Sequence, residues 1–231
     1  MNEYTLEIKL LSDTTFGMGA GVSGVVDAEI QHDDLGLPIL SGRSIKGLLV
    51  NQCSEIIFAL GEGNPWESVA KRVFGFRGET LGDSDDHFSI GDATIAPDLV
   101  KAIHYQNENS PAPLSRQEVL DSLTDIRHQT AMNEYGAPMD ESLRANRVLI
   151  RGITLYAPLT LNSRTDDFEK ALLAACVLSL RRAGLGRNRG KGKIQVVVTD
   201  RPLNPTEFSE TDQVKDLTQE WFITFKQEVA R

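Results

Sequence analysis

Apolar and polar residues alternate in several short segments, a pattern that is typical of half-buried strands. The first such segment is 4–10, in which every second residue is apolar. Further strands are expected over 88–95, along the β-rich run 148–161, which Gly152 and Pro158 interrupt, and over 193–199.

Helical spacing of apolar residues recurs in longer segments between these strands. Residues 45–60 predict one helix, which Ser41 or Ser44 can cap. Asp166–Leu180 predicts another, with Asp166 and Glu169 in the positions of a capping box. A further amphipathic helix is expected over 212–229, where helical spacing accounts for the aromatic residues as core packing rather than base-stacking groups.

The order strand, helix, strand, strand, helix, strand is that of the ferredoxin-like βαββαβ unit. We therefore predict an α+β fold with a ferredoxin-like (RRM-like) core, in a single domain over residues 1–231. Insertions are expected at about 12–40, 61–87 and 97–146, followed by a C-terminal helix at about 212–230. The last insertion is polar and irregular apart from a possible short helix at 116–123, and a segment of that length is commonly functional or mobile.

Composition is ordinary for a globular protein, with 40% hydrophobic and 25% charged residues among 231. The formal net charge of -9 argues against a uniformly basic nucleic-acid binder, although it leaves room for one concentrated basic face. No apolar run is long enough to cross a bilayer and no secretory signal is visible, so we expect a cytoplasmic protein with no membrane partner. Cys53 and Cys176 are interpreted as buried apolar residues, not as a disulfide or a metal site.

Positive charge is concentrated in Arg181–Lys193, which holds six cations, four glycines and no acid. Glycine allows a close approach of the backbone to a ligand, and arginine presents a planar fork that fits phosphate oxygens. The segment is therefore suited to hold several phosphates, although it could also be a solvated basic turn after a helix. The candidate contacts are Gly186, Arg187, Asn188, Arg189, Lys191 and Lys193.

Another candidate anion site lies at the start of the first predicted helix. Ser41, Gly42, Arg43 and Ser44 occupy its N-terminus, where unpaired N–H groups and the helix dipole favour negative charge, and Lys46 follows. An ordinary helix cap explains the serines equally well. The acidic cluster Asp83, Asp85 and Asp86 could bind a divalent cation, but without EF-hand-like spacing a solvated loop is the plainer interpretation.

These two glycine-containing motifs together resemble the RAMP superfamily of CRISPR systems, and most closely its Cas7-type backbone subunits of type III effector complexes. The first family motif usually reads Ile-Pro-Gly-Ser-Ser-Leu-Lys-Gly. Here Gly42, Ser44, Lys46 and Gly47 match, while Leu40-Ser41 replaces the proline. The terminal family loop typically reads Gly-Gly-x-x-Ser-x-Gly-x-Gly, of which Gly184–Gly192 is a close variant.

The resemblance covers most of the chain. The segment from Gly24 to Pro38 is similar to the family loop that carries the cleavage aspartate, which this resemblance places at Asp27, with Asp33 and Asp34 as fallback candidates. The segment from Arg127-His128 to Leu161 resembles the family's thumb hairpin and the strand after it, so Arg127 and His128 join the RNA-binding candidates. His128 could instead act as an acid–base group.

The family resemblance implies a subunit that binds guide RNA through its phosphates and cleaves complementary target RNA in antiviral defence. Its implied partners are both RNAs, copies of itself or related Cas7 subunits, and other type III subunits. Family cleavage proceeds by attack of a ribose 2′-hydroxyl on the adjacent phosphate and depends on a loop aspartate and a divalent cation, here taken as Mg²⁺, which Asp27 could hold. No organic cofactor is implied.

Other functions stay open at this point. A non-catalytic RNA-binding subunit would use Asp27 only to stabilise a turn. A guide-processing endoribonuclease would need a histidine or tyrosine acid–base set near the basic loop. A small-molecule enzyme with a phosphate-binding loop is the least favoured, because the Walker and Rossmann patterns are absent.

Overall fold

A computed structural model gives the fold for residues 2–22, 24–75, 88–139, 141–201, 203 and 214–230. Asp83, Asp85 and Asp86 lie outside these described residues. The elements, in chain order, are β1 (Asn2–Leu10), α1 (Gly42–Leu60), α2 (Trp66–Phe74), β2 (Phe88–Ile90), α3 (Pro97–Asn109), α4 (Arg116–Leu123), β3 (Thr124–Gln129), β4 (Arg144–Leu149), β5 (Thr154–Leu161), α5 (Asp167–Ser179), the 3-10 turn η1 (Arg187–Arg189), β6 (Ile194–Thr199) and α6 (Thr218–Val229).

The main sheet has four strands in the order β2-β5-β1-β6. β1 pairs antiparallel with β5 and with β6, so Leu6 lies between Ala157 and Val198. The second and third core strands, β2 and β5, pair antiparallel through Phe88 and Leu161. This arrangement, with α1 after β1 and α5 after β5, confirms the predicted α+β class and its ferredoxin-like core.

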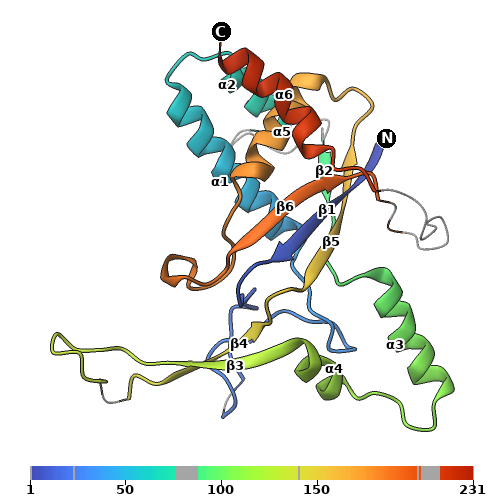
Figure 1. Ribbon diagram of the computed structural model, residues 1–231, viewed down its shortest axis with the longest axis vertical. Helices are drawn as coiled ribbons and strands as arrows, with labels where there is room; N and C mark the ends of the chain where they lie inside the picture. Colours follow the sequence, from blue (N-terminus) through green and yellow to red (C-terminus); the bar gives the residue numbers. More distant parts are fainter. Residues whose placement is uncertain are drawn as a thin grey trace.

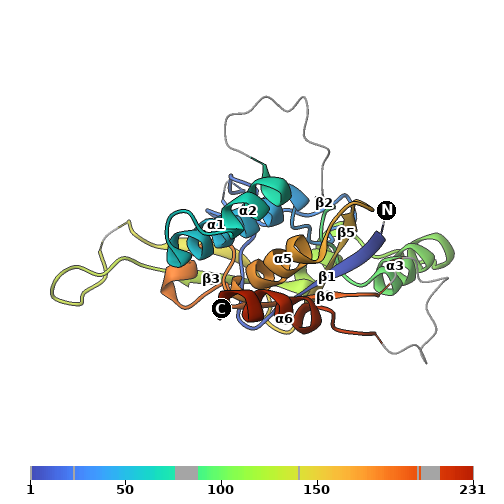
Figure 2. The same ribbon diagram turned by 90° about the horizontal axis from the view of Figure 1, so that it is seen from above.

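Four of the helices lie apart from the second sheet, β3–β4, which two other helices accompany (Figure 1). Figure 1 shows α1, α2, α5 and α6 together beyond one end of the main sheet, with α3, α4 and the hairpin β3–β4 at the other. The hairpin extends away from the body of the protein, as Figure 2 also shows from above. The sequence predicted this thumb-like projection, and we call residues 124–149 the thumb hairpin.

Helix α5 forms the centre of the core because eight of its 13 residues are buried, including the whole run from Ala171 to Val177. It packs on α1, α2 and α6 and contacts β6. The aromatic residues of α6 belong to this core: the Phe225 ring lies 4.5 Å from that of Trp66, and the Trp221 ring meets Tyr4 edge-on at 5.1 Å. The described α6 begins at Thr218 rather than near 212, and its aromatics pack as helical spacing predicted.

The predicted β-rich run over 148–161 is two separate strands. Gly152, with a φ of +94°, follows Arg151 in a turn that divides β4 from β5. β4 pairs with β3 in the thumb hairpin, whereas β5 enters the main sheet. The expected strand over 88–95 is also shorter, since only Phe88–Ile90 pairs with β5 as a strand.

Two helices were missed in segments interpreted as loops. α2 buries Trp66, Val69 and Val73 on one face, although its nine residues are few for a periodic signal. α3 fully buries only Ile103 and partly buries Val100, so its apolar stripe is too short to give a periodic signal. The short helix suspected at 116–123 is confirmed as α4, which a Ser115–Glu118 capping box begins.

Cys53 and Cys176 are both buried thiols, as expected, and they face each other across α1 and α5. Burial raises the pKa of the Cys176 thiol well above its usual value. Among the helices in the described ranges, none is both long enough and apolar enough to cross a membrane.

Candidate nucleic-acid interface

The basic segment Arg181–Lys193, which we call the glycine loop, returns the chain from α5 to β6. Its stem is bonded to the residues that follow β1. The Leu185 N–H donates to Thr15 O at 2.9 Å, the Gly192 N–H to Asp13 O at 3.2 Å, and the Lys193 N–H to the Ser12 hydroxyl at 2.8 Å. The loop is therefore held at the C-terminal end of β1, on the side of the thumb hairpin.

Glycine is required in this stem for steric reasons. Gly192 has a φ of +70°, and a Cβ there would lie 2.0 Å from the carbonyl oxygen of Ala183. At Gly184, with a φ of +85°, a Cβ would lie 2.6 Å from Thr15 O. A side chain at either position would combine an unfavourable backbone conformation with a clash against backbone.

The tip of the loop presents its cations to solvent. Arg187, Asn188 and Arg189 are exposed, and Lys191 is half-buried. Inside the loop, the Arg182 guanidinium donates to Arg187 O at 2.8 Å. Within the described part of the chain, no carboxylate pairs with Arg187, Arg189, Lys191 or Lys193, whereas the arginines of the thumb hairpin are paired. The loop thus retains positive charge that the protein does not neutralise.

Hollows flank the glycine loop on both sides. Toward α1, a hollow of about 330 Å³ has Glu55 and Gln52 of that helix on one side and Arg182, Arg187 and Asn188 of the loop on the other. Toward the thumb hairpin, a groove of about 870 Å³ lies between Arg189 and the residues Thr130, Ser142 and Arg144. An extended polyanion could therefore contact the loop cations from either side.

The N-terminus of α1 is partly occupied by the protein itself. Ser41 caps the helix and accepts the Ser44 N–H at 3.3 Å, as predicted. The Gly42 N–H donates to the Asp92 carboxylate at 2.8 Å, so a negative group already uses one of the first amides. Gly42 is also sterically required, because a Cβ would lie 2.1 Å from Ile90 O. A protein carboxylate therefore already uses one of the amides that the sequence pattern offered to an anion.

The side chains of this motif point in different directions. Ser44 lines a pocket of about 460 Å³ together with Gly184 and Leu185 of the glycine loop. Lys46 instead places its ammonium 5.0 Å from the centre of the Phe88 ring, toward β2. Arg43 is exposed. The structure therefore brings Ser44 to the glycine loop but leaves Lys46 directed elsewhere.

Asp27 lies against the base of the thumb hairpin. Its N–H donates to Ala145 O at 2.7 Å, and its Oδ2 accepts the Ala145 N–H at 2.7 Å. Its Oδ1 accepts from the Arg144 guanidinium at 3.1 Å. The next residue, Ala28, forms a parallel bridge with Asn146, so the loop that carries Asp27 runs alongside β4.

These contacts decide the charge of Asp27. The Ala145 N–H, and after it the Arg144 guanidinium, lower the pKa of the Asp27 carboxyl below the ordinary aspartate value of 3.8. The side chain is 40% exposed, so a ligand can still reach it. Asp27 is therefore a carboxylate at neutral pH that can orient a hydroxyl, but it is a weak base.

The fallback aspartates occupy a different environment. Asp33 Oδ1 accepts the N–H groups of Leu35 and Leu37 at 2.9 and 2.8 Å, which fixes the turn before Pro38. Asp34 is an exposed residue of the same turn. Their contacts are with this turn and not with the glycine loop or the thumb hairpin.

Arg127 and His128 project from β3 in different ways. Arg127 donates through Nε to Asp13 at 2.9 Å and also pairs with Asp125, so the protein already uses its guanidinium. His128 is exposed and lies directly across from Ala145, the residue that binds Asp27. The structure thus places His128 one strand away from the Asp27 contact.

Several residues that shape this region were missed from the sequence. Arg147 and Glu29 form a buried ion pair at 2.9 Å, and Arg147 also binds Asp121 and Thr124. Asp13 and Arg144 are the ion-pair partners of two candidate residues. The only sequence signal was charge inside apolar segments, at Glu29 before Ile30 and at Arg147 before Val148-Leu149.

A Mg²⁺ site built from protein groups alone does not fit these residues. Within the described ranges, no group of three or more His, Cys, Asp or Glu side chains lies close enough to hold a metal ion. Asp27 supplies a single carboxylate, and both of its oxygens already accept hydrogen bonds.

Comparisons with known proteins bear on the family and the fold. The family model of the RAMP superfamily matches residues 7–195. A chain of Type III-B Cmr-beta, solved by cryo-EM with cognate target RNA bound, is similar at 15% identity and a TM-score of 0.60, covering 85% of this chain and 96% of that one. A chain of Type III-B Cmr-beta in the apo state is similar at 14% identity and a TM-score of 0.57, and the match covers 84% of this chain and 96% of that one. A search of curated proteins finds no match.

The structural likeness shows a shared fold, and the family match runs from β1 into β6, across both glycine-containing motifs. The chain therefore belongs to the RAMP superfamily.

Proposed function

We propose that this protein is a backbone subunit of a type III CRISPR effector complex that holds guide RNA through its phosphates. The observation that carries the proposal is the glycine loop, whose cations have no carboxylate partner in the described part of the chain and stand between two hollows. Phosphate contacts carry no sequence information, which suits a subunit that must accept a variable guide. Base pairing between guide and target then supplies specificity.

The thumb hairpin suits a role beside this RNA. Met132 and Tyr135 near its tip are 60% and 86% exposed, so apolar surface is available to contact bases. The groove between the hairpin and Arg189 leads past Arg144. We propose that RNA follows this groove, which brings its backbone toward the Arg144–Asp27 pair.

Target cleavage is the second part of the proposal. Asp27 would accept a hydrogen bond from a ribose 2′-hydroxyl and hold it in line with the adjacent phosphate, while the thumb hairpin displaces the neighbouring base. Because its pKa is lowered, Asp27 contributes mainly by orientation. A divalent cation such as Mg²⁺ would neutralise phosphate charge, held mostly by RNA and water since the protein supplies few donors.

A non-catalytic RNA-binding subunit is the second candidate. The observation that favours it is that both Asp27 oxygens already accept hydrogen bonds, from Ala145 and Arg144. In that case Asp27 fixes the loop to β4 and takes no part in chemistry. Guide processing has less support, because it needs a set of acid–base residues near the basic loop. In the described structure, His128 is the one histidine candidate on the thumb hairpin, and Asp27 has no histidine partner.

The experiment that tests the proposal is reconstitution of the complete complex with this subunit and a labelled target RNA. Retained guide RNA together with regularly spaced target fragments supports the proposal. A complex that assembles without RNA contradicts it, and one that binds target without cutting it selects the non-catalytic candidate. Incubation of the isolated chain with repeat RNA tests guide processing, since cleavage without partners would favour that activity.

A further inference from the structure

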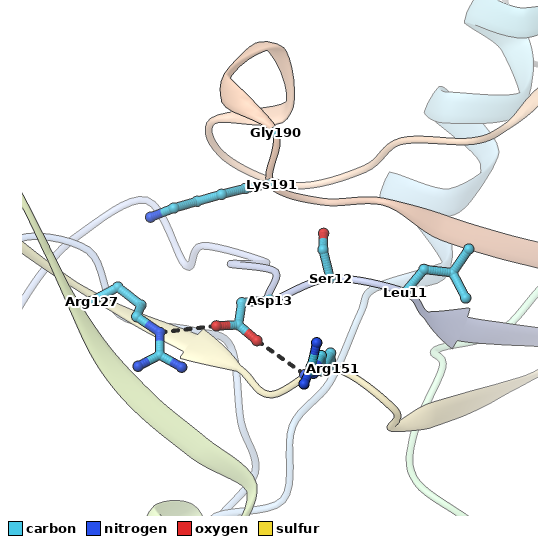
Figure 3. A pocket seen from close by; sticks show the side chains of 7 residues that line it. All are labelled: Leu11, Ser12, Asp13, Arg127, Arg151, Gly190 and Lys191. Carbon is cyan, nitrogen blue, oxygen red and sulfur yellow. Dashed lines mark hydrogen bonds and ion pairs between the residues drawn. The ribbon is translucent and has the colours of Figure 1, made fainter.

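A cavity of about 500 Å³ opens on the side of the glycine loop that faces the base of the thumb hairpin. Four segments meet there: the residues after β1, strand β3, the turn between β4 and β5, and the loop itself. Figure 3 shows the side chains of Asp13, Arg127, Arg151 and Lys191 around it. Its lining therefore carries three cations and one carboxylate.

The single carboxylate is fully used by the protein. Asp13 Oδ2 accepts from Arg127 Nε at 2.9 Å, and Oδ1 accepts the backbone N–H of Arg151 at 3.2 Å. The Asp13 main chain also accepts the Gly192 N–H. Asp13 thus connects the thumb hairpin, the β4–β5 turn and the glycine loop at one point.

The other cations are not neutralised. Within the described ranges, the Arg151 and Lys191 side chains have no carboxylate partner, and Figure 3 shows Lys191 extended across the opening on the side of Arg127. Only Arg127 is paired, with Asp13 and with Asp125. The cavity retains positive charge, with guanidinium groups from two different elements on its wall.

We propose that this cavity is a phosphodiester subsite in which an RNA phosphate competes with Asp13 for Arg127. The inference rests on the proposed function, and it assigns ligand contacts to Arg151 and a regulating role to Asp13. A phosphate bound by Arg127, Arg151 and Lys191 joins the thumb hairpin to the glycine loop through the ligand. Without RNA, Asp13 makes that connection itself.

The size of the Asp13 effect separates this role from simple scaffolding. Asp13→Asn keeps the size of the side chain and one acceptor oxygen but removes a negative charge from the subsite. Loss of any acid reduces repulsion of RNA, so competition predicts that Asp13→Asn raises RNA affinity more than Asp98→Asn, the same change on the exposed face of α3. If Asp13 only fixes the hairpin, Asp13→Asn raises RNA affinity no more than Asp98→Asn does, or lowers it.

The test measures binding of a fluorescent single-stranded oligouridylate to the full chain over a series of salt concentrations. Each lost phosphate contact lowers the steepness of log K against log salt by about 0.7. If binding at about 1 M salt is unchanged, this makes binding about fivefold weaker at about 0.1 M. We expect this loss for Arg151→Gln and Lys191→Gln, and tighter binding for Asp13→Asn than for Asp98→Asn. Lys101→Gln, on the exposed face of α3, is the matched control and leaves the slope unchanged.

An RNA-free measurement keeps the inference testable by itself. Titration with inorganic pyrophosphate should shift the Arg127 Nε–H resonance in the native chain, and Arg151→Gln should weaken that shift. If Arg151→Gln and Lys101→Gln bind RNA alike, or pyrophosphate leaves Arg127 unmoved, the subsite is wrong while the proposed function stands. If pyrophosphate shifts the Arg127 resonance but neither the chain nor its complex binds RNA, the cavity binds phosphate groups, while its assignment to RNA and the proposed function fail.

Discussion

Asp27 and Ala145 are joined by two hydrogen bonds of 2.7 Å. The Asp27 N–H donates to the Ala145 carbonyl oxygen, and the Ala145 N–H donates to the Asp27 carboxylate. The candidate cleavage residue is therefore attached to the thumb hairpin itself. Any displacement of β4 moves Asp27 with it, so base displacement by the hairpin and orientation of the 2′-hydroxyl would be coupled geometrically.

The first prediction concerns the protonation of Asp27. Its pKa is lowered in the folded protein, so the stabilising contact is fully present above the unfolded value of 3.8 and is lost as the pH falls through the lower folded value. A carboxyl-carbon NMR titration should give a midpoint below 3.8. Arg144→Gln should raise that midpoint, and a midpoint that does not respond would remove Arg144 from the account.

The second prediction separates catalysis by Asp27 from scaffolding. Asp27→Asn retains an acceptor for the Ala145 N–H, so assembly of the complex should be normal while target cutting is abolished. Asp33→Asn is the control, because Asn can keep the turn that Asp33 forms with Leu35 and Leu37. Cutting at the full rate by the Asp27→Asn complex, measured on gels that resolve each cleavage position, would assign Asp27 to structure.

The third prediction tests the buried pair below the thumb hairpin. Glu29 and Arg147 have side-chain exposures of 4% and 5%, so removing one partner leaves a buried charge. Arg147→Ala should lower the free energy of unfolding by about 3–5 kcal/mol in denaturant titrations. Replacing both residues by apolar ones of similar size should cost less than Arg147→Ala, and a larger cost for the double change would contradict this explanation.

The fourth prediction concerns the glycine loop. Gly192→Ala should destabilise the protein by at least about 1–2 kcal/mol, because left-handed backbone and a clash with Ala183 O act together. Gly47→Ala, inside α1 with nothing within 4 Å of the added carbon, should stabilise by about 1 kcal/mol. Thermal unfolding of both variants measures the two changes in stability. If Gly192→Ala is as stable as Gly47→Ala, the glycine loop tolerates a side chain at Gly192.

The fifth prediction follows from the net charge of -9. The isolated chain should bind single-stranded RNA weakly, because its acidic surface opposes the glycine loop. Arg187→Gln and Arg189→Gln should each lower the salt slope by about 0.7. Tight binding by the monomer that does not respond to salt would contradict the proposed interface.

Much of the fold follows from the sequence, because the core elements carry strong periodic signals. The alternation in β1 and the apolar stripe of α5 predicted their pairing and burial. α3 had no such signal, since only Ile103 is fully buried. Gly152 indicated the boundary between β4 and β5, whereas Pro158 lies inside β5 and does not interrupt it. Which sheet each strand joins is a tertiary choice that local pattern does not encode.

The candidate site was less predictable for a similar reason. Glycine spacing indicated the loop, and the structure shows why Gly192 cannot be replaced without strain. The partners of Asp27 and Arg127 are far away in the sequence, at Arg144 and Asp13, and no short motif records them. The direction of Lys46 toward Phe88 likewise depends on the packing of α1 against β2.

The most direct test of the central claim is purification of the tagged protein from its native host, followed by sequencing of the RNA that accompanies it. The account predicts short RNAs of defined length that contain CRISPR repeat sequence, and their loss when Arg187 and Arg189 are both changed to glutamine. An assembled complex without RNA, or with RNA unrelated to the repeats, would contradict it.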